Sequence, residues 1–170
     1  IISIDPENYA ALSNKGSLLA KSGKYEESIA FLQKASQKNS SSEDIWYNLA
    51  NAYYSLGDYR ESANAYKNAT IISPNDASAW LGLGIAQIQS EEYEEALHNI
   101  DRSISLQQNN TNSWYNKGLA LVALNRSSEA LHAFEMVLKI DPENSFAKNS
   151  SILTGNYISE AKNTQNKDNQ

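Results

Sequence analysis

Cysteine is absent from the sequence, and this absence excludes several kinds of structure and chemistry. Without cysteine the chain has no disulfide framework, no thiolate metal site and no cysteine nucleophile. Basic residues are also in the minority, with 14 Lys and Arg against 20 Asp and Glu and a net charge of -6. Because binding to a phosphate backbone needs clustered basic residues, we expect no nucleic-acid partner.

Long apolar runs are missing as well. No run approaches the roughly 20 residues that cross a bilayer, and no charged start precedes an apolar signal core. We therefore expect a soluble chain without a membrane partner; its compartment is unknown, with a cytoplasmic location favoured. The first residues, IISIDPEN, match KIDPEN at 139–144, so residues 1–8 are interpreted as the end of a preceding repeat.

A repeated pattern is the main feature that the sequence does contain. Residues 114–118 read WYNKG, and the same frame reads WYNLA at 46–50, WLGLG at 80–84 and LSNKG at 12–16. A fixed period of 20–50 residues indicates units that bury their apolar faces only by stacking on one another. The sequence therefore predicts a repeat array, to which domain counting by length does not apply.

Residues 43–76 form the clearest unit of this array. Its first half carries apolar residues with the three-and-four spacing of a helix face: Trp46, Leu49, Ala50, Tyr53 and Leu56. Gly57 and Asp58 interrupt that spacing, which resumes in the second half at Tyr59, Ala63, Tyr66, Ala69 and Ile72. Pro74 then disfavours further helix. The unit is predicted to be helix, turn, helix and stop.

Small residues occupy one slot of the first helix, and large residues occupy one slot of the second. The small slot holds Gly16, Ala50, Gly84 and Gly118, and the large slot holds Tyr66, Ile100 and Phe134. A missing or minimal Cβ lets two helices approach closely, and large side chains fill the space around that contact.

These residues carry a resemblance. The order Trp-x-x-Leu-Gly/Ala-x-x-Tyr, followed by a small residue, a large residue and a closing proline, resembles the tetratricopeptide repeat, a 34-residue helix–turn–helix unit. The resemblance implies an all-α, right-handed α-solenoid. It divides the chain into four copies, 9–42, 43–76, 77–110 and 111–144, a capping helix at 145–160 and a disordered polar tail at 161–170.

Several positions depart from the family pattern. Leu12 replaces the tryptophan, Lys15 and Lys117 replace a leucine, Ser40 and Gln108 replace the proline, and Glu91 and Asn125 replace the turn glycine. Asparagine tolerates a positive φ better than most residues, so Glu91 is the less expected of the last two. None of the departures shifts the phase.

The resemblance also implies that first helices line a concave groove. A second stripe of the first helices, beside the core-facing one, is predicted to line this groove. It includes an asparagine row, Asn14, Asn48 and Asn116, which Gly82 interrupts. A primary amide offers a donor and an acceptor, as a peptide backbone does. A similar asparagine ladder is associated with peptide backbone binding in the O-linked N-acetylglucosamine transferase, whose array this one resembles. The alternative is that these asparagines are solvated filler.

The predicted groove changes in character along the chain. Its early part presents polar and aromatic residues, and its later part presents apolar ones that continue at Leu153 of the cap; some of the apolar residues could instead lie beneath neighbouring helices. The predicted peptide-binding residues are Asn14, Asn48, Asn51, Asn116, Tyr47, Tyr54, Tyr115, Leu81, Ile85, Ile88, Leu119 and Val122.

Other kinds of site are not supported by the residues. Relatives that bind acidic chaperone tails use paired basic residues as a carboxylate clamp, but these slots hold Ser13, Ser17, Asn48, Ser78 and Gly82. His98 and His132 share a repeat position without a third ligand, so we expect no metal and no other cofactor. No nucleophile with a base and no glycine-rich phosphate loop can be assembled, so we expect no enzyme activity.

The sequence therefore predicts a scaffold that binds a peptide or flexible protein segment in its concave groove. Two alternatives stay open. The array could be structural and self-associating, or it could present substrates to a catalytic domain elsewhere in a larger enzyme.

Overall fold

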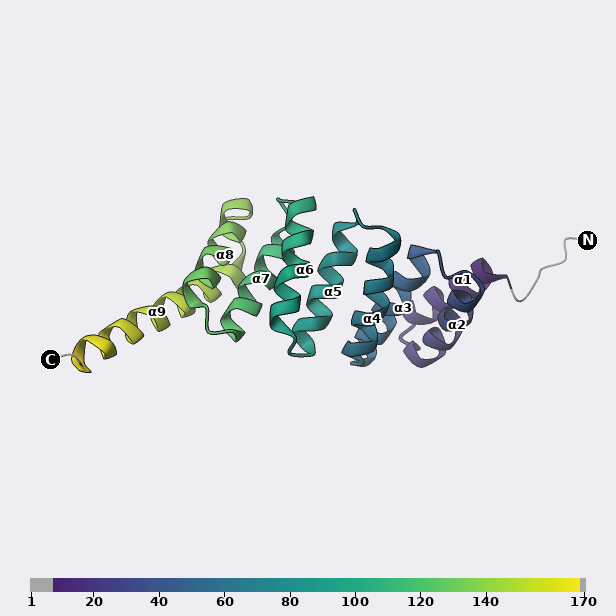
Figure 1. Ribbon diagram of the computed structural model, residues 1–170, viewed down its shortest axis with the longest axis horizontal. Helices are drawn as coiled ribbons and strands as arrows, with labels where there is room; N and C mark the ends of the chain where they lie inside the picture. Colours follow the sequence, from purple (N-terminus) through teal and green to yellow (C-terminus); the bar gives the residue numbers. More distant parts are fainter. Residues whose placement is uncertain (1–7, 169–170) are drawn as a thin grey trace, which may run out of the picture.

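A computed structural model describes residues 8–168, and these residues form an all-α array of sequential helices (Figure 1). The helices in this range are α1 (Tyr9–Lys21), α2 (Tyr25–Lys38), α3 (Glu43–Leu56), α4 (Tyr59–Ile72), α5 (Ala77–Gln89), α6 (Tyr93–Leu106), α7 (Thr111–Ala123), α8 (Ser127–Ile140) and α9 (Ser145–Asp168). The all-α repeat architecture predicted from the sequence is confirmed.

Each helix packs against the next one, so the array is a row with α1 and α9 at opposite ends (Figure 1). First helices also reach one another, since α1 contacts α3 and α5 contacts α7. Within the described part of the chain, no two second helices contact each other to a similar extent. First helices are therefore closer together, which curves the row with α1, α3, α5 and α7 on its inner side.

The turn inside each helical pair adopts the same backbone conformation. Gly23 and Gly57 have φ angles of 75° and 92°, and Glu91 and Asn125 follow with 64° and 59°. All four residues thus adopt the left-handed conformation, although only glycine adopts it without a steric penalty. The repeat frame imposes this conformation on Glu91, because the chain must reverse there to start α6.

Replacing Glu91 with glycine should raise the free energy of unfolding by about 1 kcal/mol, because glycine removes the strain between Cβ and the backbone. Urea unfolding followed by circular dichroism measures this change. Gly57→Ala provides the matched control and should lower stability by a similar amount. A Glu91→Gly variant no more stable than the parent would mean that the left-handed glutamate is unstrained.

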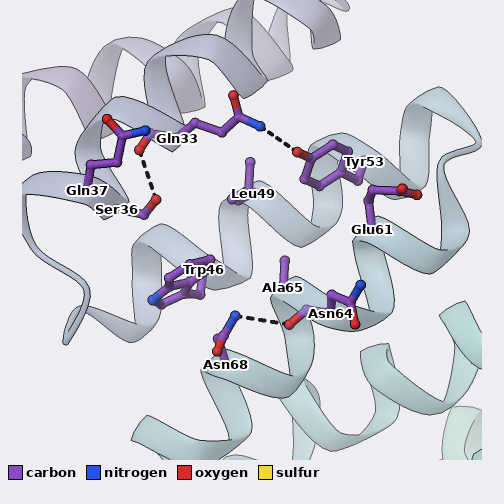
Figure 2. Close-up of a pocket in the computed structure, with 10 residues that line it drawn as sticks. All are labelled: Gln33, Ser36, Gln37, Trp46, Leu49, Tyr53, Glu61, Asn64, Ala65 and Asn68. Atoms are coloured by element: carbon purple, nitrogen blue, oxygen red, sulfur yellow. Dashed lines mark hydrogen bonds between the residues drawn. The ribbon is translucent and has the colours of Figure 1, made fainter.

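The tryptophan of the repeated quintet ties the second, third and fourth helical pairs to the loop before each of them. The indole nitrogens of Trp46, Trp80 and Trp114 donate to carbonyl oxygens six residues earlier, at distances of 2.8, 3.0 and 2.9 Å. The acceptors belong to Ser40, Pro74 and Gln108. Because only the main chain accepts, residues other than proline serve equally well. Figure 2 shows Trp46 beside Leu49 on α3.

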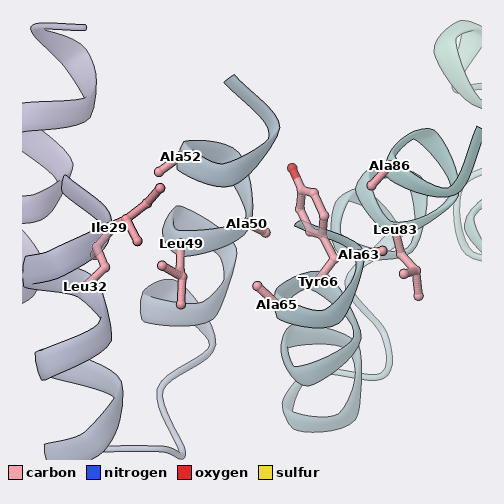
Figure 3. Close-up of a cluster of buried hydrophobic side chains, with 10 residues drawn as sticks. All are labelled: Ile29, Leu32, Leu49, Ala50, Ala52, Ala63, Ala65, Tyr66, Leu83 and Ala86. Atoms are coloured by element: carbon pink, nitrogen blue, oxygen red, sulfur yellow. The ribbon is translucent and has the colours of Figure 1, made fainter. Parts of the chain in front are cut away.

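Small residues on first helices do pack against large residues on second helices, as predicted. A Cβ added at Gly16 would lie 2.6 Å from Cγ of Leu32, and one added at Gly118 would overlap the ring of Phe134. In the second pair, Ala50 faces the ring of Tyr66 within a core that also includes Leu49 (Figure 3). These contacts set the close spacing of the helices within each pair.

The last helix is longer than the sequence analysis predicts. α9 continues from Ser145 to Asp168, through a segment for which a disordered tail is expected after residue 160. No glycine or proline follows Gly155, and extending a formed helix costs far less than starting one. Residues 169–170, and residues 1–7 of the predicted preceding repeat, lie outside the described residues.

None of the helices in residues 8–168 is both long and apolar enough to span a membrane.

Candidate functional site

The asparagine row lies along the inner helices α1, α3 and α7. Asn14 is exposed, and Asn48 and Asn116 are half-buried. The Asn116 amide donates to the carbonyl oxygen of Asn112 at 2.8 Å, which leaves its own oxygen free. Asn14 and Asn48 make no side-chain hydrogen bond within the described part of the chain. The row therefore keeps unused donors and acceptors for a ligand.

Tyr66 explains why the row is interrupted. A Cβ at Gly82 would overlap the Tyr66 ring, so an asparagine there has no room for its side chain. Tyr66 itself is only 5% exposed, and its hydroxyl donates to Oδ1 of Asn51. This hydrogen bond engages Asn51, one of the predicted ligand-binding amides. The ring of a second helix thus reaches into the position that asparagine holds elsewhere.

The predicted tyrosine walls are anchored by other aromatic rings. Tyr47 meets Tyr66 edge to face with ring centroids 5.5 Å apart, and Tyr54 packs on Tyr59 at 5.3 Å. Burial raises the pKa of Tyr47 above its usual value, and the charges of Asp76 and Glu43 add to this effect. Burial likewise raises the pKa of Tyr54, with a smaller contribution from Tyr59. Both hydroxyls therefore stay protonated at neutral pH and can donate hydrogen bonds.

Tyr115 occupies the corresponding position on α7. Its ring lies 5.7 Å from that of Phe134 and 6.5 Å from that of Phe146 on α9. Because two rings hold it, Tyr115 is a rigid part of the inner face.

Leu81 does not line the inner face, so that part of the site prediction is wrong. It is 8% exposed and belongs to a core cluster with Ile100 and Ile104. The equivalent residues, Tyr47 and Tyr115, also pack on the second helix of their own pair, but they are only half-buried. The shorter leucine in this position is buried within the core.

The remaining apolar residues differ in how far a ligand could reach them. Ile85 and Ile88 are half-buried and pack against the cluster around Leu81. Leu119 and Val122 on α7 are 37% and 44% exposed. The structure thus places two apolar side chains of the predicted set in the open and leaves two more at the edge of the core.

Helix α9 extends this apolar surface at Leu153, as the sequence analysis expects, and also at Tyr157, which that analysis did not identify. A cavity of about 290 Å³ is lined by Val122, Asn125, Ser127, Leu153, Thr154 and Tyr157. Leu153 is 69% exposed, and Tyr157 is exposed as well. Applying the repeat period to α7 would have found Tyr157 too, because it follows Ala123 by one period, as Leu153 follows Leu119.

Family models match most of this array. One described as "TPR repeat" matches residues 16–57 and 50–90, and one described as "Tetratricopeptide repeat" matches residues 111–144. Together they cover more than half of the chain. A search of curated protein sequences finds no significant match.

Solved structures share the fold over most of the chain. YrrB, described as a TPR protein with an unusual peptide-binding site, is 25% identical, with 93% of this chain and 81% of that chain covered and a TM-score of 0.80. MamA is 20% identical, with coverages of 85% and 84% and a TM-score of 0.82. The first TPR of Spaghetti (RPAP3), bound to the HSP90 peptide SRMEEVD, is 20% identical, with coverages of 69% and 95% and a TM-score of 0.66.

Proposed function

The chain belongs to the tetratricopeptide repeat family, whose arrays commonly bind proteins or peptides, and on this basis we propose that it is a protein-binding scaffold. The inner face of α1, α3, α5 and α7 is its binding surface, and the ligand is a peptide or flexible segment of another protein. The observation that carries this proposal is the row of amides on the inner helices with unused hydrogen-bonding groups. The similarity to YrrB, described as having a peptide-binding site, supports it.

Backbone capture by Asn14, Asn48 and Asn116 is the proposed mechanism. Each amide has a donor or an acceptor that can pair with the main chain of an extended segment. Tyr66 fills the space beside Gly82 and leaves no room for an amide there, so the ligand is held in two stretches with no amide of the row between them. Beyond this surface, Leu119 and Val122 receive apolar side chains of the ligand.

Replacing Asn14, Asn48 and Asn116 with alanine should lower the affinity for the captured partner by about a hundredfold, since each hydrogen bond contributes roughly 1 kcal/mol. Affinity capture from the native cell extract identifies the partner, and titration with a peptide from it measures the loss. Folding should be unaffected, because the exposed and half-buried amides make no contact in the core.

A matched control variant carries Asn75→Ala and Asn109→Ala, two exposed asparagines away from the inner face. It should capture the same partner as the parent. If the inner-face variant also retains that partner at full affinity, the asparagines are solvated filler and backbone capture is excluded.

A self-associating array is the second candidate, and the exposed apolar side chains of α9 favour it. Phe146 and Ile152 are among the most exposed large apolar residues in the described part of the chain. Sedimentation equilibrium at rising concentration separates the candidates. A constant monomer mass supports the scaffold, and a mass that grows with concentration supports self-association.

A further inference from the structure

The outer side of the array carries a trench between α2 and α4 that has no role in the proposed inner-face binding. The cavity measures about 410 Å³ and is shown in Figure 2. Its floor consists of Leu49 and Ala65, both buried, with the half-buried rings of Trp46 and Tyr53 at its two ends. Its rim consists of polar side chains from both second helices: Gln33, Ser36, Gln37, Glu61, Asn64 and Asn68.

Two of the four rim amides are engaged within the protein and two are not. Gln33 donates to the Tyr53 hydroxyl at 2.7 Å, and Asn68 donates to the carbonyl oxygen of Asn64 at 3.2 Å. The side-chain amides of Gln37 and Asn64 make no hydrogen bond within residues 8–168. Because Gln37 projects from α2 and Asn64 from α4, free donors face the trench from both of its walls.

The spacing of the aromatic rings matches one particular backbone conformation. Trp46 and Tyr53 are two helical turns apart on α3, which places them on the same side and roughly 10 Å apart along the helix. A polyproline II helix repeats every three residues with a rise of about 3.1 Å per residue, so its same-facing side chains are roughly 9 Å apart. Two prolines in a Pro-x-x-Pro segment can therefore pack on either side of Leu49, each against one ring.

The hydrogen-bonding groups fit the same ligand. A polyproline II backbone has no internal hydrogen bonds, and its proline residues offer carbonyl acceptors without amide donors. The amide nitrogens of Gln37 and Asn64 supply the donors that such carbonyls need. At the Tyr53 end, the exposed carboxylate of Glu61 has no ion pair among the described residues. It can pair with a basic residue next to the prolines.

The other two outer seams have lost these features. In the seam over α5, Gln87 replaces Tyr53 and accepts a hydrogen bond from Asn99 at 2.6 Å, while His98 replaces Asn64. In the seam over α7, Lys117 replaces Leu49 and is paired with Asp101. The aromatic pair and the free amides therefore occur together only at the first of these three seams.

We propose that the trench formed by α2, α3 and α4 binds a proline-containing segment of a partner protein in the polyproline II conformation. The segment carries a Pro-x-x-Pro pair over Trp46, Leu49 and Tyr53 and a basic residue beside Glu61. Recognition of this kind relies on a preformed ligand helix and an aromatic-lined groove. It gives the array an outer binding site that is independent of the inner face.

The test uses a blocked synthetic peptide that contains arginine followed by two Pro-x-x-Pro units. We expect saturable binding by calorimetry, with a shift of the Trp46 indole resonance in nitrogen-15 spectra. The double variant Gln37→Ala and Asn64→Ala should bind about tenfold more weakly, as expected for two lost hydrogen bonds. Both side chains are exposed and unpartnered, so the variant should keep the thermal stability of the parent.

The matched control carries Ser105→Ala and His132→Ala, the equivalent exposed positions of the third seam. It should bind the peptide as the parent does, and so should the variant with alanine at Asn14, Asn48 and Asn116. The proposal is overturned by a peptide that shows no saturable binding up to about 1 mM. It is also overturned by equal affinity for the trench variant, or by a loss confined to the inner-face variant.

Discussion

Replacing Gly82 with asparagine lowers the free energy of unfolding by about 2 kcal/mol, although it restores the residue found in three of the four copies. The new Cβ overlaps the buried ring of Tyr66, whose hydroxyl is held by Asn51. Overpacking a dense core in this way typically costs about 1–3 kcal/mol. Urea unfolding measures the loss.

The clash disappears when the ring is removed. In a Tyr66→Leu background, Gly82→Asn should cost almost nothing, because the same pair of positions one period earlier holds leucine and asparagine, Leu32 of the first copy and Asn48 of the second. The two substitutions should therefore couple by about 2 kcal/mol in a double-mutant cycle.

The control for this cycle is Gly155→Asn, since a Cβ at Gly155 meets nothing within 4 Å. It should leave stability unchanged or raise it slightly, because glycine is a weak helix former. Additive effects of Gly82→Asn and Tyr66→Leu would show that the ring does not dictate the glycine.

This coupling also shows what the sequence could and could not reveal. The gap at Gly82 is visible in the sequence, because the other three copies hold asparagine. Its cause lies in the preceding repeat, in the side chain of Tyr66 on α4, and a pattern within one repeat does not report it. Contacts between neighbouring repeats depend on side-chain length, which helical spacing ignores.

The period, by contrast, was readable because four copies report it together. The left-handed turns at Gly23, Gly57, Glu91 and Asn125 fall at one position of the frame, even where glutamate replaces glycine. Tertiary packing overrides the local preference there, and only the alignment of the copies reveals the turn. Repetition thus compensates for a weak local signal.

The burial of individual side chains was the property that helical spacing predicted least well. Leu81 shares a position with Tyr47 and Tyr115, yet its shorter side chain stays within the core. The end of α9 was also misjudged, since a polar composition does not stop a helix that is already formed.

The second large effect is on binding. Introducing aspartate at Leu119 and Val122 should lower the affinity for the captured partner by more than about a hundredfold, because a charge in an apolar contact must lose its water without gaining an opposite charge. Both side chains are exposed, so helicity and thermal stability should stay as in the parent. Ile85 is a poorer choice for this test, because it packs against the cluster of Leu81 and its replacement would also disturb the core.

Leu18→Asp and Ile71→Asp form the matched control, because Leu18 and Ile71 are both exposed and lie outside the predicted inner-face set. Unchanged affinity in the Leu119 and Val122 variant would exclude the apolar part of the proposed site and leave backbone capture as its only part.

A selective loss of affinity in that variant would have a further consequence. The asparagines read only the main chain, so discrimination among partners would depend on the apolar end, where α7 and α9 meet around the cavity of Val122 and Leu153. The same array would then combine a permissive stretch with a selective one, and the length of α9 would matter to function as well as to capping.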